Sequence, residues 1–360
     1  MKKLDIILLS AVITISLFGI IMIFSSSYVW AEYKFNDPLK YVKHQSLFFL
    51  IGLFIMHLVI KVDYMNYYKK ANKLLLLTIF LLILVIIPGI GSIRNGSRSW
   101  FGIGSFGIQP SEAAKLGLII FTSKYLNNNN KELGNIKKGV LPLLLVVFLV
   151  FFLIMMQPDF GTGVIIVLSI IGLLFISGVK MVFFIKLGLL GILGVMGLIL
   201  IAPYRLERIL SFLNPWQDPL GSGLQIIQSL YAIGPGGLLG QGFLNSRQKQ
   251  FYLPEPQTDF IFSIISEEFG FMGVIIVTTL FLTIIIRGIR IAIKANNPFS
   301  KYLAFGIIFQ IAIQTLLNLM VVVGIIPVTG VTLPFLSYGG SSLLVSMISI
   351  GILLNISKNS

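Results

Sequence analysis

The chain has 360 residues, of which 56% are hydrophobic and 11% charged, and its mean hydropathy is +0.95. A soluble globular chain has about 25% charged residues, so this composition excludes an ordinary soluble domain and indicates a protein that crosses a membrane several times. The absence of cysteine excludes disulfides and thiolate metal sites. The two histidines, His44 and His57, are too few for a histidine-rich metal centre.

The formal net charge is +14, an excess of basic residues that nucleic-acid-binding proteins also have. In membrane proteins, however, Lys and Arg collect in the cytoplasmic loops that connect the apolar spans. The basic residues of this chain recur between apolar segments in that way. We therefore predict a protein that contacts membrane lipids and has no nucleic-acid partner.

Ten apolar segments are candidates for helices that span a bilayer, whose hydrocarbon core of about 30 Å needs about 20 helical residues. The first follows the basic start MKKLD, which resembles a signal peptide, but no clear small-residue cleavage site follows, so we predict that it is retained. The fourth is the least apolar because it contains Glu112 and Lys115. The segments are 6–26, 46–60, 74–89, 110–126, 139–156, 163–179, 183–202, 259–287, 302–325 and 340–356.

Ten spans place both termini on one side of the membrane, and the loops on that side carry 17 of the 27 basic residues. The positive-inside rule therefore predicts that both termini are cytoplasmic. The predicted fold class is an all-α integral membrane protein with about ten transmembrane helices and a long extracellular loop between helices seven and eight. We expect 1–360, with the outer loop 203–258 included, to form a single polytopic membrane domain. The outer face receives 28–45, 90–109, 157–162, 203–258 and 326–339.

The outer face carries arginines and lysines although the positive-inside bias disfavours them there. A pyrophosphate held at the membrane surface would explain them, because guanidinium groups match phosphate oxygens in pairs. Solvated loop charge is the alternative for any single one of them. The main candidates for phosphate binding are Arg98 in RNGSRSW, Arg205 and Arg208 in YRLER, and Arg247 in SRQKQ, which also contains Lys249.

Two further acidic positions lie near this face. Glu112 and Lys115 are three residues apart on the fourth span, close enough to meet on one helix face. They form either a self-neutralising buried pair or a pair whose lysine is shared with an anionic ligand from outside. Asp159 in QPDFGTG is best explained as the N-cap of the sixth span, although it would also suit a cation.

Asp259 opens the eighth span in LPEPQTDFIFSIISEE, where carboxylates meet a long apolar run. If that helix begins near residue 257, Asp259 lies in its first turn, where the helix dipole alone would favour a carboxylate. Helical spacing places Ser263, Ser266 and Glu267 on the same side as Asp259. Intramembrane acids are typically functional, and desolvation would raise the pKa of Asp259 and make it a better base. Glu268 points about 100° away from Glu267 and has no predicted role.

Other common catalytic and nucleotide-binding motifs are missing from the sequence. The stretch GPGGLLGQG (234–242) lacks the dinucleotide spacing and follows no evident strand, which argues against a nucleotide site. There is no P-loop, no HExxH and no GxSxG. The sequence also lacks an internal repeat, which would have favoured a transporter built from inverted halves.

Taken together, the segments closely resemble the SEDS family (shape, elongation, division and sporulation), which comprises FtsW, RodA and SpoVE proteins. The resemblance covers nearly the whole chain. From APYR through PQTDFIF it is stronger to SpoVE and Gram-positive FtsW proteins than to RodA proteins. The matching motifs are RNGSRSWFGIGSFGIQPSEAAKL, QPDFGTG, APYRLERILSFLNPWQDPLGSGLQIIQSLYAIGPGGLLGQG, SRQKQFYLPEPQTDFIFSIISEEFGF and IPVTGVTLPFLSYGGSS.

This resemblance implies a ten-helix fold with an outward-facing cavity and a peptidoglycan glycosyltransferase that polymerises lipid II outside the membrane. The process would be cell division or the synthesis of spore cortex or septum, with a class B penicillin-binding protein as the transpeptidase partner. The family's essential aspartate matches Asp259, its Glu–Lys pair matches Glu112 and Lys115, and its QPDxGT acid matches Asp159. Ser337, in the last matching motif, is a supporting candidate.

The reaction implied by the resemblance is an inverting transfer in which Asp259 is the general base for the acceptor hydroxyl and undecaprenyl pyrophosphate leaves. Arg98, Lys115, Arg205 and Arg208 would meet the pyrophosphate charge, with Mg²⁺ or another divalent cation as a possible aid. The sequence does not indicate which residues would bind this cation, and we expect no organic cofactor. A lipid II flippase ranks second, because the inner loops offer few polar motifs for a path across the membrane. A structural scaffold of the division complex is the third alternative.

Overall fold

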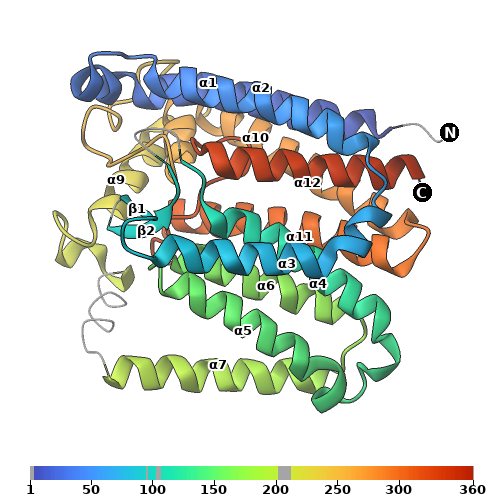
Figure 1. The fold of residues 1–360 in the computed structure, drawn as a ribbon. Coiled ribbons are helices and arrows are strands. Elements are labelled where there is room, and N and C mark those ends of the chain that lie inside the picture. The colour runs from blue at the N-terminus through green and yellow to red at the C-terminus, as the bar shows by residue number, and fades with distance from the viewer. Residues whose placement is uncertain (1–3, 95, 103–106, 202–211, 360) are drawn as a thin grey trace.

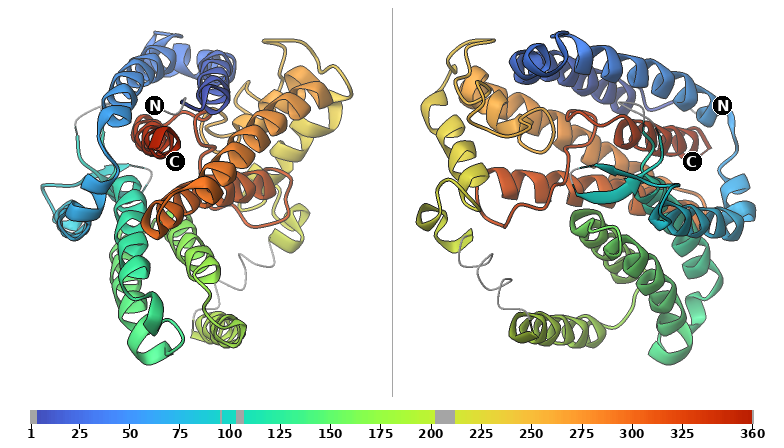
Figure 2. Two further views of the ribbon diagram at one scale, coloured as in Figure 1. Left: turned by 90° about the vertical axis from the view of Figure 1, so that its right-hand side faces the viewer. Right: turned by 60° about the vertical axis from the view of Figure 1, so that its left-hand side comes forward.

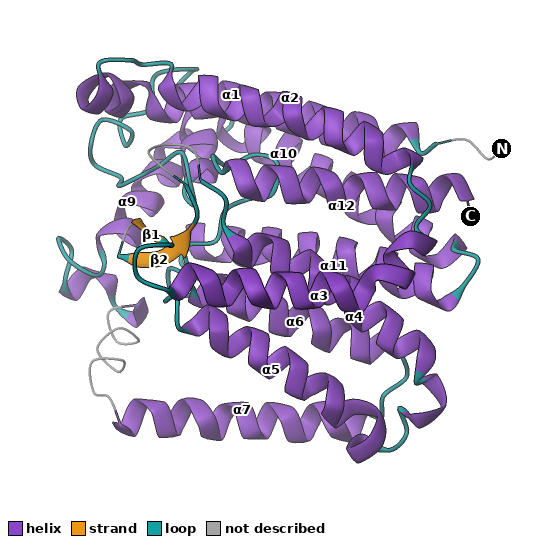
Figure 3. Ribbon diagram, in the orientation of Figure 1, coloured by secondary structure: helices purple, strands orange, loops and turns teal. Residues whose placement is uncertain are grey.

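The structure is a computed structural model that describes residues 4–94, 96–102, 107–201 and 212–359. Long helices run side by side through the molecule, and the two chain ends lie at the same end of the bundle (Figure 1). Among the described residues the one β-hairpin lies toward the opposite end, among the longer loops (Figure 3). This arrangement agrees with the prediction that both termini face the same side of the membrane.

The bounds of the elements follow in chain order. The long helices are α1 (Ile6–Phe35), α2 (Lys40–Lys61), α3 (Met65–Ile86), α4 (Pro110–Asn128), α5 (Leu141–Met155), α6 (Phe160–Ile176), α7 (Met181–Ile201), α10 (Ile261–Lys294), α11 (Pro298–Val322) and α12 (Gly340–Asn359). The short elements are β1 (Ser92–Arg94), β2 (Ser97–Trp100), η1 (Asn130–Glu132), the π-helical turn η2 (Ile136–Val140), η3 (Pro215–Gln217), α9 (Leu224–Ile233) and η4 (Gly234–Gly236).

Helix α12 lies inside the bundle and packs against α1, α2, α4, α10 and α11. In the left view of Figure 2 it is the red helix between the blue and orange ones. Every residue from 349 to 356 is buried, so this part of the helix is enclosed on all sides. A helix that is apolar nearly all round is typical of such an interior position.

Among the described residues, six helices are long and apolar enough to cross a membrane: α1, α2, η2 with α5, α10, α11 and α12. The all-α membrane fold class is thereby confirmed. Each of the other four predicted spans overlaps one helix, namely α3, α4, α6 or α7. The exact number of membrane crossings, and the single-domain organisation, stay predictions.

One predicted outer loop is wrong. The segment 28–45 is mostly helical, because α1 continues to Phe35 and α2 already begins at Lys40. At 1.5 Å per residue, the 30 residues of α1 are longer than an apolar core of about 30 Å requires. Its last turns carry Trp30 and Tyr33, whose rings pack against Phe251 at centroid distances of 5.7 and 5.4 Å. Hydropathy marks only the apolar part of a helix. The last turns of α1 are less apolar, and they pack against Phe251 in the loop between α9 and α10.

Helix α10 is broken at Gly270, where φ is 59° and ψ is −152°. The carbonyl groups of Glu267 and Glu268 accept hydrogen bonds from Gln241 N (2.9 Å) and Gly242 N (3.0 Å) in the loop after α9. In return, the amides that follow the break, Phe271 N and Met272 N, donate into the same loop, to the carbonyls of residues 237 and 238. Irregular backbone inside a membrane protein is tolerated only where such partners satisfy it.

This docking explains the glycine-rich stretch GPGGLLGQG. A Cβ on Gly236 would lie 2.2 Å from Ser266 O, and one on Gly240 would lie 2.2 Å from Glu268 O. The two backbones approach so closely that only glycine fits between them. The glycines therefore allow the backbone of this loop to pack directly against the backbone of α10 at the break.

The Gly240→Ala substitution is expected to destabilise the protein more than Gly89→Ala. Both positions have positive φ (78° and 88°), but only Gly240 faces a backbone atom, since nothing lies within 4 Å of a Cβ built on Gly89. Overpacking typically costs about 1–3 kcal/mol, and this cost would add to the φ strain that both variants share. Thermal unfolding of the detergent-solubilised variants measures the difference. Equal melting temperatures would contradict the close approach.

Candidate functional site

Four parts of the chain that are distant in sequence meet at the end of the bundle opposite the termini. They are the loop before α10, the loop before α12, and the starts of α4 and α6. Tyr338 N donates to Gln257 O at 2.9 Å and so joins the first two loops. Ser341 Oγ accepts from Gln109 N at 3.1 Å and ties the start of α12 to the start of α4. The predicted acidic residues are gathered around this junction.

Asp259 lies in the loop before α10, because the helix begins at Ile261 with Phe260 as its N-cap. The prediction that Asp259 occupies the first helical turn is therefore wrong. Pro254 and Pro256 restrict the preceding backbone and favour turns over an earlier helix start. The Thr258 hydroxyl donates to Asp259 Oδ1 at 2.8 Å.

The environment of Asp259 suits a base. Its side chain is half-buried, and burial raises the pKa of the carboxyl above its ordinary value of 3.8. The negative charge of Glu255 raises this pKa further, whereas the hydrogen bond from Thr258 lowers it. A carboxylate with a raised pKa accepts a proton more readily, as general-base catalysis requires.

Glu112 and Lys115 form the predicted ion pair. Lys115 Nζ lies 2.9 Å from Glu112 Oε1 and donates to Gln314 Oε1 of α11, also at 2.9 Å. Both charged residues are buried, with 2% of Lys115 and 7% of Glu112 exposed. A buried charge needs a partner of this kind. The pair thus links α4 to α11, and binding of a phosphate by Lys115 stays a prediction.

Asp159 caps α6, as its position in QPDFGTG predicts. Its Oδ1 accepts from Thr162 N at 3.2 Å, which satisfies one of the free amides of the first turn. Its Oδ2 accepts from Gln109 Nε2 (2.9 Å) and from the Ser111 hydroxyl (3.1 Å) at the start of α4. Asp159 therefore joins the starts of α4 and α6, and its two oxygens are engaged within the protein.

Lys249 and Glu268 form a second buried ion pair, which the sequence did not reveal. Lys249 Nζ lies 2.7 Å from Glu268 Oε1, and both side chains are fully buried (0% exposed). The Ser25 hydroxyl of α1 donates to the two Glu268 oxygens, at 2.6 and 2.7 Å. This cluster fastens the loop at Lys249 to α1 and α10 and gives Glu268 a role.

Glu267 and Ser263 do not share a polar surface with Asp259, which corrects the predicted stripe. Glu267 accepts hydrogen bonds from the Ser246 hydroxyl at 2.5 Å and from Arg247 N at 2.8 Å, so it holds the loop after α9. The Ser263 hydroxyl lies 2.7 Å from the Ser229 hydroxyl of α9. These side chains face the long loop because it folds back onto α10, which helical spacing alone does not reveal.

The remaining candidates lie at the same end. Arg98 is half-buried on β2, and Arg247 is exposed in the loop after α9. The Ser337 hydroxyl accepts from Leu333 N at 2.9 Å and stabilises the turn before α12. Arg205 and Arg208 lie outside the described residues. Phosphate binding by these arginines stays a prediction.

Sequence reasoning missed Asn318 and Gln314, two buried amides on α11. Asn318 Nδ2 donates to Asp259 O at 2.7 Å, and Gln314 Nε2 donates to Thr332 O at 2.9 Å. The sequence contains a pattern that could have revealed them, because strongly polar amides recur four residues apart within this apolar span. In membrane helices such residues typically face other parts of the protein.

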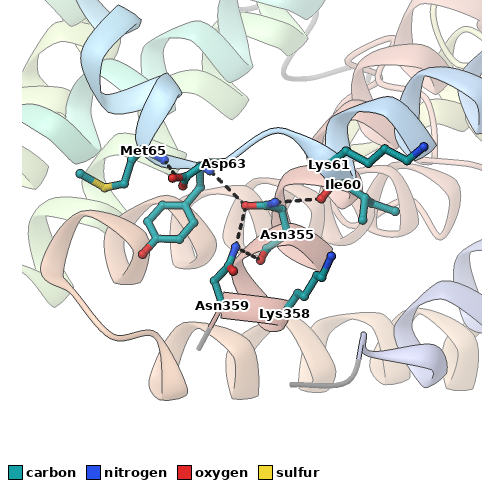
Figure 4. A pocket seen from close by; sticks show the side chains of 8 residues that line it. Ile60, Lys61, Asp63, Met65, Asn355, Lys358 and Asn359 are labelled. Carbon is teal, nitrogen blue, oxygen red and sulfur yellow. Dashed lines mark hydrogen bonds between the residues drawn. The ribbon is translucent and has the colours of Figure 1, made fainter. Parts of the chain in front are cut away.

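Cavities lie on the described surface at both ends of the bundle. One, of about 250 Å³, is lined by Trp30, Phe251 and Glu255 and lies beside the loop that leads to Asp259. The other, of about 380 Å³, lies at the opposite end, near the C-terminus, where Asn355 joins α12 to the α2–α3 turn (Figure 4). The second cavity belongs to the end that carries the termini, so it is separate from Asp259.

The described residues contain no cluster of three or more His, Asp or Glu side chains that would hold a metal ion. Asp159 has its oxygens occupied by protein donors. Mg²⁺ bound to pyrophosphates typically keeps several waters and only one or two protein carboxylates. The possible divalent cation therefore stays a prediction.

Comparisons with known proteins cover the whole chain. Stage V sporulation protein E of Bacillus subtilis (strain 168) is 52% identical, over 100% of this chain and 99% of that protein. A probable peptidoglycan glycosyltransferase FtsW of Geobacter sp. (strain M18) is 41% identical, over 98% of this chain and 96% of that protein.

Solved structures share the fold. One, from work described as "Structural coordination of polymerization and crosslinking by a peptidoglycan synthase complex", has a TM-score of 0.80 at 30% identity and covers 99% of this chain and 98% of that chain. The rod shape determining protein RodA of Thermus thermophilus has a TM-score of 0.73 at 25% identity and covers 99% and 97%. The family model described as cell cycle protein, FtsW/RodA/SpoVE, matches residues 5–360. This chain therefore belongs to the FtsW/RodA/SpoVE family and is a multi-pass protein of the cytoplasmic membrane.

Proposed function

We propose that the protein is a peptidoglycan glycosyltransferase that polymerises lipid II into glycan strands on the outer face of the cytoplasmic membrane. The observation that carries the proposal is Asp259, a half-buried carboxylate with a raised pKa in the loop before α10. The name of the Geobacter relative, a probable peptidoglycan glycosyltransferase, supports the reaction class. The sporulation protein among the relatives supports a role in division or in spore wall synthesis.

The proposed reaction is an inverting transfer between two lipid-linked saccharides. The Asp259 carboxylate takes the proton of the acceptor hydroxyl as the oxygen attacks the anomeric carbon of the donor. The bond from that carbon to the pyrophosphate oxygen breaks, and undecaprenyl pyrophosphate leaves from the opposite side. The proton then passes from Asp259 to solvent. Base catalysis of this kind is typically worth about 10²–10⁴-fold.

Stabilisation of the leaving pyrophosphate would supply part of the remaining rate. Arg98 and Arg247 lie at the same end of the bundle as Asp259 and expose their side chains at least in part. Arg205 and Arg208 are the further candidates from the sequence. A divalent cation would share this charge when bound.

The proposed partner is a class B penicillin-binding protein that cross-links the strands. The similar chain from the peptidoglycan synthase complex supports such an assembly, because its description couples polymerization to crosslinking. The exposed loop residues around the cavity near Asp259 belong to the face that such a partner would reach.

The test is a polymerisation assay with purified lipid II in detergent. The protein is assayed with and without a class B penicillin-binding protein, and with Mg²⁺ or a chelator. Glycan chains resolved on a gel would support the glycosyltransferase. Transfer of labelled lipid II across liposome bilayers without chain growth would instead favour the flippase. The absence of both activities would favour the scaffold.

The pH dependence of the polymerisation follows from the raised pKa of Asp259. A general base works when it is deprotonated, so activity falls as the pH drops through the pKa of the folded protein. Because burial raises this pKa above 3.8, the acid limb of kcat/KM is expected at a higher pH than an ordinary aspartate would give. Glu255→Gln removes a negative charge that raises the pKa, so its acid limb should move to lower pH. An unchanged limb in this variant would contradict the assignment of the limb to Asp259.

A further inference from the structure

A chain of hydrogen bonds connects the buried Glu112–Lys115 pair to the loops that carry Asp259. Lys115 Nζ donates to Gln314 Oε1 at 2.9 Å. The other end of the same amide, Gln314 Nε2, donates to Thr332 O at 2.9 Å. Gln314 therefore joins a charged pair on α4 to the backbone of the loop before α12.

Asn318 continues the connection one helical turn further along α11. Its Nδ2 donates to Val331 O at 2.7 Å and to Asp259 O at 2.7 Å. Residues four apart lie on the same face of a helix, so Gln314 and Asn318 face the same loop, and they hold adjacent carbonyls of it. We call Gln314 and Asn318 the α11 amide pair.

The α11 amide pair places two polar side chains in the protein interior. Asn318 is fully buried and 3% of Gln314 is exposed. Asn318 Oδ1 has no hydrogen-bond partner among the described residues, and an unsatisfied buried acceptor carries a free-energy cost. Apolar side chains of similar size would leave the carbonyls of Asp259, Val331 and Thr332 without these donors. The amides therefore fix the backbone of the two loops, which an apolar contact between helices would not do.

We propose that Gln314 and Asn318 are positioning residues for the base, and that the Glu112–Lys115 pair acts on Asp259 through them. Asn318 fixes the carbonyl of Asp259 itself, so it sets the place of the main chain from which the carboxylate projects. Lys115, shared between Glu112 and Gln314, fixes the orientation of the Gln314 amide. This inference rests on the proposed function, because it assigns Asp259 as the base.

Positioning has a kinetic signature that differs from substrate binding. Misplacing a reacting group by about 1 Å can cost about 10²-fold in rate. Loss of an interaction that only positions the base lowers kcat and leaves KM for lipid II nearly unchanged, whereas loss of a ground-state phosphate ligand raises KM. For Asn318→Ala and Lys115→Met we therefore expect kcat to fall about 10- to 100-fold at constant KM.

Two substitutions of Gln314 separate its two hydrogen bonds. Gln314→Glu keeps an acceptor for Lys115 but loses the donor to Thr332 O, whereas Gln314→Met loses both. If the loop is held through Gln314, kcat should fall in both variants. Full activity of Gln314→Glu would show that Gln314 serves only as a hydrogen-bond acceptor for Lys115 and would overturn the proposed connection.

A double-mutant cycle between Lys115→Met and Asn318→Ala tests whether the residues act as a unit. Substitutions within one hydrogen-bond network have non-additive effects on the activation free energy. For independent residues the fold losses in kcat multiply. We expect the double variant to lose little more kcat than the worse single variant. A loss equal to the product of the single losses would overturn the coupling.

Hydrogen–deuterium exchange supplies a readout that needs no activity. In Asn318→Ala the amides of 255–260 and 328–338 should exchange faster, with the rest of the protein unchanged, because the two loops lose a shared anchor. Unchanged exchange would overturn the proposal. If Asp259→Asn polymerises normally, the assignment of the base fails. If Asp259→Asn is inactive while Asn318→Ala and Lys115→Met keep normal kcat, only the positioning proposal fails.

Discussion

Asp259→Asn is expected to reduce the rate of glycan polymerisation by at least about 10²–10⁴-fold, the usual worth of a general base. An amide cannot accept the proton of the acceptor hydroxyl at neutral pH. The local structure should survive, because an amide oxygen can still accept the hydrogen bond that Thr258 donates at 2.8 Å, and because Asn318 holds the backbone of residue 259 and not its side chain.

The stability of this variant can be predicted from the sign of the pKa shift. An aspartate whose pKa is raised on folding costs stability above its unfolded pKa, since the unfolded chain loses the proton at lower pH than the folded protein. Asp259 therefore destabilises the protein at neutral pH, and removing its charge should leave the melting temperature equal or higher. An inactive and thermally intact variant is the expected result.

The matched control is Asp218→Asn in the same long loop. Asp218 is exposed, and among the described residues its carboxyl accepts hydrogen bonds from Gly221 and Ser222, close by in the same loop. This change should therefore leave chain growth at the wild-type rate. Quantifying glycan chains from lipid II on a gel, at equal protein concentration, decides the outcome. Wild-type chains from Asp259→Asn would remove Asp259 as the base.

Lys249→Met is expected to cause a large loss of stability. It leaves Glu268 without its counter-ion in a site where both side chains are 0% exposed. Removing one partner of a buried ion pair typically costs about 3–5 kcal/mol. The loop from Ser246 to Leu253 should then detach from α1 and α10, because Lys249 is one of the side chains that anchor it.

Two further variants separate charge from packing. In Lys249→Met/Glu268→Gln the buried charge is removed together with its partner, and the Gln oxygen can still accept from Ser25, so most of the lost stability should return. Lys43→Met breaks the exposed pair with Asp37, where 62% and 35% of the side chains are exposed, and should change the melting temperature little. Thermal unfolding in detergent measures all three. A Lys249→Met protein as stable as the wild type would contradict the cluster.

Much of the fold could be predicted because its signals are local. Apolar runs mark the spans, and each of the predicted spans overlaps one helix. Asp159 precedes a helix start and caps it, and Glu112 and Lys115 are three residues apart and meet on one helix. These outcomes depend on helix geometry, which fixes the relation between neighbours in sequence whatever surrounds them.

Errors arose where a loop returns to a helix. Helical spacing grouped Glu267 and Ser263 with Asp259, but the loop after α9 folds over α10 and binds Glu267 instead. The break at Gly270 was also missed, because a glycine in an apolar run is compatible with a continuous membrane helix. The helix can break there because backbone groups of residues 237–242 form hydrogen bonds with the backbone groups that the break leaves free.

The sequence by itself determined an all-α membrane protein of a recognisable family, with Asp259 as its leading candidate base. Only the tertiary structure decided what holds that base and its loop. Asn318 lies 59 residues from Asp259 in sequence, Lys249 lies 19 residues from Glu268, and Ser25 lies 243 residues from Glu268. The physical reason is that a buried polar group needs a partner but does not specify in its own sequence which segment supplies it. That choice is made when the helices pack and bring the distant segments together.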